Sequence, residues 1–221
     1  MSVQFSKGLE DVIADQTSIS NVEGDLGRLS YRGYTIEQLV TLSFTRVVWL
    51  VLFGELGTAE QEQQLEKYLQ ANGELSDSEL NILAALPRQL HTMRMLQSMI
   101  PVLDTTPKGP QELPFTNKEG YRGLAVVAKI PTLLASFRRL QLNDKLPVFN
   151  SSKPYLDNFL SMFHAKDASA DHIRCLEMLQ ILQLEHSFNA GTFTLRVAAS
   201  TLSPVESALS SAVGSLYGTL H

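Results

Sequence analysis

The chain has 221 residues, of which 44% are hydrophobic and 19% are charged, and these values are typical of a globular protein with a hydrophobic core. Its formal net charge of −5 argues against a general nucleic-acid binder or a binder of anionic membranes, because both need a basic surface. The single cysteine, Cys175, cannot form an internal disulfide. Its helical surroundings predict an inert, buried thiol.

The N-terminal stretch MSVQFSKGLEDV lacks the apolar segment of a secretory signal peptide. The longest apolar run, VVWLVLF at 47–53, is far shorter than the ~20 residues that a membrane-spanning helix needs. We therefore expect a cytoplasmic protein with no membrane partner and no nucleic-acid partner.

Two short β-type runs, at 18–22 and 28–31, flank the turn-forming sequence EGDLG near the N-terminus. This pattern predicts a small hairpin. The rest of the chain has helical periodicity, so the expected fold class is all-α, with many helices and a small N-terminal β-hairpin.

Five helix starts have the spacing of a capping box, in which a hydroxyl accepts a hydrogen bond from the third helical N–H. These starts are Thr35, Thr58, Ser76, Thr116 and Ser203. Together with the apolar periodicity they predict helices over 35–43, 45–54, 58–72, 76–84, 91–103, 117–141, 154–164, 169–184, 187–200 and 204–218. Pro131 should kink the longest of these helices.

Histidines are the main candidates for chemistry. The sequence has no Gly-rich phosphate loop, no nucleophile elbow and no His/Cys/Asp/Glu cluster with metal-ligand spacing, so we expect no metal. We expect His164 and His172 to be solvated or to cap helices. A structural role is favoured for His91 at a helix start, beside the alternative that it neighbours an active site.

Polar residues interrupt an apolar stretch around His186 and Asn189. The two are three positions apart, so they share a face if the helix is continuous. Gly191 allows a backbone or a ligand to approach closely. Two interpretations stay open: the imidazole and the amide satisfy each other and the helix ends, or they belong to a binding site.

Six segments, in this order, resemble the citrate synthase family over nearly the whole chain: KGLEDVIADQTSIS, YRGYTIEQL, LPRQLHTMRMLQSMI, KIPTLLASFRRL, LEHSFNAGTFTLRV and GSLYGTLH. The resemblance implies an almost all-α fold with a large and a small domain, an obligate homodimer, and condensation of acetyl-CoA with oxaloacetate. No cofactor is implied, because acetyl-CoA is a substrate. Residues 1–221 would form the N-terminal part of the large domain, truncated at the start of the small domain.

The resemblance also implies roles for three residues. His221 matches the histidine of the family's G-P-L-H-G-G motif, which donates a hydrogen bond to the thioester carbonyl oxygen as the acetyl enol forms. His186 matches the histidine of the H-E-x-N-A-S motif, which helps to bind oxaloacetate, and Asn189 takes the adjoining position. The family's second catalytic histidine, its catalytic aspartate and its carboxylate-binding arginines lie beyond the position of His221, so this chain alone is expected to be inactive.

The sequence departs from the family pattern at three positions: Ser187 replaces the usual acid, Gly191 replaces a common Ser, and Thr219 replaces a common Pro. The first change bears on the oxaloacetate site. Three alternatives therefore accompany citrate synthase: a 2-methylcitrate synthase that uses propionyl-CoA, a non-catalytic helical interaction or regulatory protein, and an enzyme of citryl-CoA cleavage.

Overall fold

The computed structural model describes residues 15–219, and every structural statement below concerns that part of the chain. A small antiparallel sheet opens it, with strands β1 (Ser20–Glu23), β2 (Arg28–Tyr31) and β3 (Tyr34–Thr35) in that order. A 3-10 turn (Gly24–Leu26) joins the first two strands, which pair from Ser20 with Tyr31 to Glu23 with Arg28. The predicted hairpin is confirmed, and a short third strand extends it.

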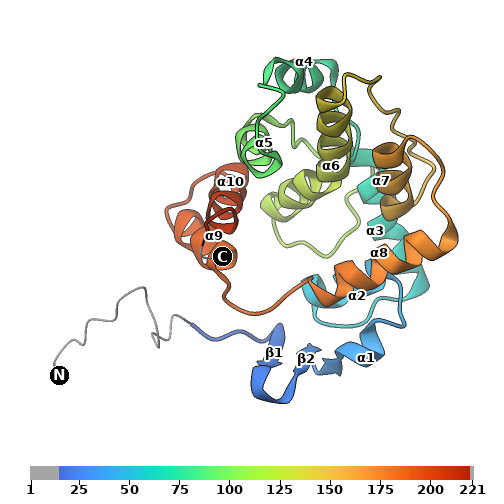
Figure 1. The fold of residues 1–221 in the computed structure, drawn as a ribbon. Coiled ribbons are helices and arrows are strands. Elements are labelled where there is room, and N and C mark those ends of the chain that lie inside the picture. The colour runs from blue at the N-terminus through green and yellow to red at the C-terminus, as the bar shows by residue number, and fades with distance from the viewer. Residues whose placement is uncertain (1–14, 220–221) are drawn as a thin grey trace.

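The regular structure in the remainder of the described chain is helical (Figure 1). They are α1 (Ile36–Leu39), α2 (Phe44–Phe53), α3 (Ala59–Asn72), α4 (Asp77–Ala85), α5 (Thr92–Met99), α6 (Lys118–Gln141), α7 (Tyr155–His164), α8 (Ala170–Leu182), α9 (Ala190–Ser200) and α10 (Val205–Leu216). A 3-10 turn, Ile100–Val102, follows α5. The expected fold class is therefore confirmed, although α1 is much shorter than the predicted helix over 35–43.

Three of the five predicted capping boxes form, at Thr35, Thr58 and Ser76. The prediction for Thr116 is wrong, because Asn117 is the N-cap of α6 and its Oδ1 accepts a hydrogen bond from the Gly120 N–H at 3.1 Å. The prediction for Ser203 is wrong as well. Its hydroxyl donates to the Ala198 carbonyl at the end of α9 instead, and α10 begins after Pro204.

The long helix α6 runs through the middle of the structure and contains Pro131, and Figure 1 shows it changing direction along its length. The pyrrolidine ring removes one backbone donor and favours such a bend. Two core clusters pack on α6, one with α4 and α5 around Leu133 and Phe137, and one with α2 and α3 around Trp49. A third cluster joins the sheet to α2 and α8.

A buried ion pair lies inside this helical core. Lys129 Nζ of α6 is 2.6 Å from a carboxylate oxygen of Glu79 in α4, and both side chains are 2% exposed. The same carboxylate accepts hydrogen bonds from the backbone N–H groups of Ser76 and Asp104. Burial alone would raise the pKa of Glu79, but the hydrogen bonds from Lys129 and the two N–H groups outweigh burial and hold its pKa below the usual value.

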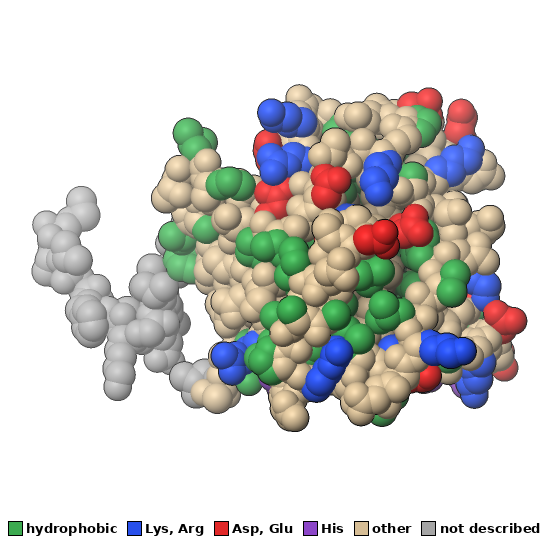
Figure 2. All heavy atoms as spheres, turned by 90° about the horizontal axis from the view of Figure 1, so that it is seen from above, with side chains coloured by type: hydrophobic (Ala, Val, Ile, Leu, Met, Phe, Trp, Pro, Cys, Tyr) green, Lys and Arg blue, Asp and Glu red, His purple; other side chains and the backbone are tan. Residues whose placement is uncertain are grey.

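The helices leave part of their apolar side chains at the surface. Figure 2 shows hydrophobic side chains in the middle of one face, with charged side chains around them. Within residues 15–219, no helix is long and apolar enough to cross a membrane. The same range holds no cluster of three or more His, Cys, Asp or Glu side chains arranged to bind a metal ion.

Candidate functional site

The segment between α8 and α9, residues 183–189, carries the predicted substrate-binding histidine. Tyr31 anchors it from the sheet: its ring is fully buried, and its hydroxyl donates to the Ile181 carbonyl at 2.8 Å. The Glu185 N–H donates to the same phenol oxygen at 3.4 Å. Burial raises the pKa of Tyr31, so the hydroxyl keeps its proton and remains a donor.

The backbone turns sharply directly after His186. Ser187 has a left-handed φ of 73°, and its N–H donates to a carboxylate oxygen of Glu185 at 2.9 Å. The other Glu185 oxygen is buried and has no hydrogen-bond partner within the described residues. His186 itself is exposed, so its imidazole is accessible to a ligand.

Asn189 is the N-cap of α9, where its Oδ1 accepts a hydrogen bond from the Thr192 N–H at 2.9 Å. The expected helix over 187–200 therefore starts only at Ala190. The condition for a shared helix face of His186 and Asn189 is not met, because the left-handed Ser187 and the Asn189 cap exclude a continuous helix there. Asn189 therefore has a structural role as a helix cap, in addition to any role in binding.

The last turn of α10 packs against this helix start. The Ser215 hydroxyl donates to the Ala190 carbonyl at 3.0 Å. A Cβ added at Gly191 would lie 3.2 Å from Asn189 Oδ1 and 3.6 Å from the Ala212 carbonyl oxygen. The close approach expected at Gly191 is therefore made by the side-chain amide of Asn189 and by the backbone of α10. His221, the predicted catalytic residue, lies outside the described residues.

His91 lies at the same end of α10. It is the N-cap of α5, where its Nδ1 accepts from the Met93 N–H at 3.2 Å, so its structural role is confirmed. Its ring centroid is 4.6 Å from that of Tyr217, the residue that follows α10. In Figure 1, α5, α9 and α10 lie together on one side of the structure.

Sequence reasoning missed two residues of this region. Tyr31 lies 150 positions before its hydrogen-bond acceptor, Ile181, and no local pattern of its strand, RLSY, reveals that contact. Arg196 covers the Phe188 ring, with its guanidinium carbon 4.7 Å from the ring centroid, and it pairs with Asp15. Arg196 lies on α9, seven positions after the Asn189 cap, and this helical spacing could have marked it in the sequence.

The structure also tests the predictions for His164, His172 and Cys175. His164 and His172 are exposed, which confirms the expectation that they are solvated. The prediction of a buried Cys175 is wrong, because its thiol is exposed. The apolar periodicity of α8 does not imply burial here: its side chains Met178 and Leu179 are also 38% and 48% exposed.

Comparison with known proteins identifies the family. The family described as "Citrate synthase, C-terminal domain" matches residues 8–221. The 2-methylcitrate synthase 1 of Corynebacterium glutamicum is 36% identical over 99% of this chain and 58% of its own length. The citrate synthase of Haloferax volcanii is 30% identical over all of this chain and 59% of its own length.

A solved citrate synthase has the same fold. The Thermoplasma acidophilum enzyme, in a ternary complex with carboxymethyl coenzyme A and oxaloacetate, superimposes with a TM-score of 0.86 at 24% identity, over the whole of this chain and 58% of its own. The chain belongs to the citrate synthase family, a family of acyltransferases. Its relatives divide between citrate synthases and 2-methylcitrate synthases, and it spans about half the length of the curated relatives it matches.

Proposed function

We propose that this chain supplies the N-terminal, large-domain part of a citrate synthase-type acyltransferase, which condenses acetyl-CoA with oxaloacetate to form citrate and CoA. His186 and Asn189 would bind oxaloacetate, and His221 would act on the thioester. The observation that carries the proposal is the hydrogen bond from Ser215 to Ala190, because it joins the last turn of α10 to the residue that follows the Asn189 cap.

The chemistry explains the need for both imidazoles. The methyl protons of a thioester are weakly acidic, so a base removes one only if a positioned donor meets the charge that develops on the carbonyl oxygen. We assign that donor to His221. A second donor must polarise the ketone of oxaloacetate, and the exposed imidazole of His186 is available for it.

Asn189 can serve the substrate while it caps α9. Its Oδ1 is occupied by the Thr192 N–H. Its Nδ2 makes no hydrogen bond within the described residues, so this amide nitrogen is the atom that would donate to a substrate carboxylate.

A second candidate is 2-methylcitrate synthase, with propionyl-CoA in place of acetyl-CoA. The observation that supports it is that relatives of both kinds match equally well: the Corynebacterium glutamicum 2-methylcitrate synthase 1 is 36% identical and the Mycolicibacterium smegmatis citrate synthase is 35% identical. One extra methylene changes discrimination by only about 1–3 kcal/mol, so both acyl-CoAs should be assayed.

We also propose a homodimer in the cytoplasm. The small residues of α9 and α10 are partly used within the chain, since Gly191 faces Ala212 and a Cβ at Gly214 would meet Gln97 of α5. Apolar side chains of the same helices, Val197 and Leu216, are 54% and 47% exposed and remain free for a two-fold contact. Sedimentation at micromolar concentration should give a dimer, and a monomer alone would contradict the proposal.

The test of activity is complementation. The 221-residue chain alone should release no CoA from acetyl-CoA plus oxaloacetate. When it is mixed with the C-terminal part of the Corynebacterium glutamicum relative, CoA release should appear, and it should fall at least about 100-fold in His221→Ala. Cys175 is exposed and would be accessible to a thiol reagent that detects CoA, so the assay should use Cys175→Ser.

The matched control for this experiment is His164→Ala, which removes an exposed imidazole at the end of α7. It should leave CoA release unchanged. Activity of the isolated chain, or equal losses in His164→Ala and His221→Ala, would overturn the proposed function.

A further inference from the structure

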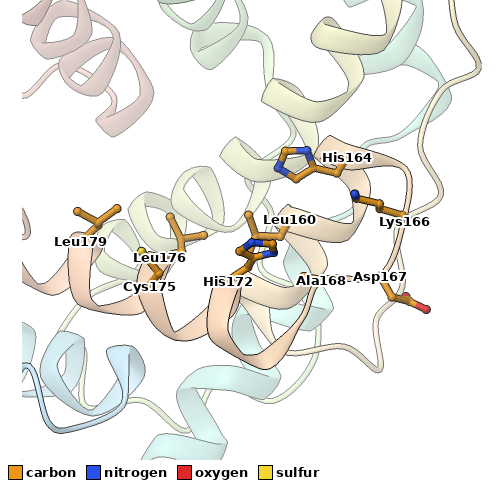
Figure 3. A pocket seen from close by; sticks show the side chains of 9 residues that line it. All are labelled: Leu160, His164, Lys166, Asp167, Ala168, His172, Cys175, Leu176 and Leu179. Atoms are coloured by element: carbon orange, nitrogen blue, oxygen red, sulfur yellow. The ribbon is translucent and has the colours of Figure 1, made fainter.

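A pocket of about 350 Å3 opens between α7 and α8, and it shares no residue with the 183–189 segment (Figure 3). Its volume is within the range of small-molecule sites. Three parts of the chain contribute its lining: α7, the link to α8 and α8 itself. The lining residues are Leu160, His164, Lys166, Asp167, Ala168, His172, Cys175, Leu176 and Leu179.

One end of the pocket is aliphatic. Leu160 comes from α7, and Leu176 and Leu179 come from the second and third turns of α8. From His172 to Leu179 the pocket follows α8 for roughly 10 Å, at 1.5 Å per residue. No Phe, Tyr or Trp occurs among its lining residues, so the wall suits a flexible alkyl chain better than a planar ring that needs stacking.

The other end is cationic. Figure 3 shows the Lys166 ammonium pointing toward the pocket and the Asp167 carboxylate pointing away from it. Asp167 is already paired, with its carboxylate 2.6 Å from Lys153 Nζ. Lys166 has no ion-pair partner between residues 15 and 219, and in the same range the imidazoles of His164 and His172 form no hydrogen bond.

We propose that this pocket binds a straight-chain monocarboxylate of medium length. The alkyl chain lies along the three leucines, and the carboxylate lies on Lys166 with the two imidazoles beside it. Lys166, unpaired among residues 15–219, offers one positive charge to one negative charge, which favours a monoanion over a phosphate or a nucleotide. The proposal stands independently of the synthase function.

The position of Cys175 provides a direct test, because it is the single cysteine of the sequence, it is exposed, and it lines the pocket. The rate of its alkylation by iodoacetamide, followed by intact mass, reports whether the pocket is occupied. Saturating octanoate should slow alkylation at least tenfold. Acetate, which has the charge without the chain, and 1-octanol, which has the chain without the charge, should not.

Two variants and one matched control test the cationic end and the aliphatic end of the pocket separately. Lys166→Gln and Leu179→Gln should each abolish the protection by octanoate, and both residues are exposed, so the fold should survive. Lys145→Gln removes another exposed lysine, which does not line this pocket, and should retain the protection. Equal protection by 1-octanol, protection that persists in Lys166→Gln, or no protection by octanoate would each overturn the proposal.

Discussion

The buried pair of Lys129 and Glu79 gives the sharpest prediction of stability. Lys129→Met keeps a side chain of similar length and removes the charge, which leaves the Glu79 carboxylate without its cation at 2% exposure. Breaking a buried pair on one side costs about 3–5 kcal/mol. Because Glu79 keeps the N–H groups of Ser76 and Asp104 at 2.7 and 2.9 Å, we expect the lower end, about 3 kcal/mol.

The assay is urea unfolding followed by far-UV circular dichroism. The matched control is Lys153→Met, because Lys153 pairs with Asp167 at the surface, where the carboxylate is 92% exposed and the pair contributes about 0–1 kcal/mol. Lys129→Met/Glu79→Gln should recover about 1–2 kcal/mol of the loss, since no unpaired charge remains buried. A loss in Lys129→Met no larger than in Lys153→Met would refute the reasoning.

Three further predictions follow from the same structure. The folded-state pKa of the Glu79 carboxylate is lowered, so the stabilisation that it provides is complete above the unfolded-state pKa of about 4.3 and is lost as the pH falls through the folded value. In Glu79→Gln, the unfolding curves at pH 3 and pH 7 should therefore lie closer together than in the unmodified chain. Asn189→Ala should cost about 0.5–2 kcal/mol through loss of the α9 cap, whereas Asn189→Asp should restore it. Tyr31→Phe should lower the free energy of unfolding by about 1 kcal/mol and should speed amide hydrogen exchange at Glu185 but not at Met93. Equal exchange rates at Glu185 in the variant and the unmodified chain would contradict the anchoring role of Tyr31.

Much of the helical order follows from local signals. The caps at Thr58 and Ser76 each need only four consecutive residues, and both form as the sequence predicts. The same logic fails at Ser203, because its hydroxyl binds the end of the preceding helix, which the capping spacing does not encode.

The site depends on contacts that local patterns cannot reveal. The sequence predicts a break at 185–186, but the observed break between α8 and α9 extends to Asn189 and is held by Tyr31 from a strand 150 positions before Ile181, a contact that no local pattern reveals. The exposure of Cys175 likewise depends on what packs against α8 in three dimensions and not on the periodicity of the helix. The family resemblance nevertheless marked His186 and Asn189, and Asn189 caps the helix whose first residue, Ala190, contacts the last turn of α10.

The central proposal is that His186 and His221 act in one cleft of the complete enzyme, with α10 packed on the start of α9. The most direct measurement is a crystal structure of the complemented enzyme with oxaloacetate bound. The account predicts that His186 donates a hydrogen bond to oxaloacetate and that the His221 imidazole lines the same cavity. Oxaloacetate bound away from His186, or the two imidazoles on opposite sides of the molecule, would contradict it.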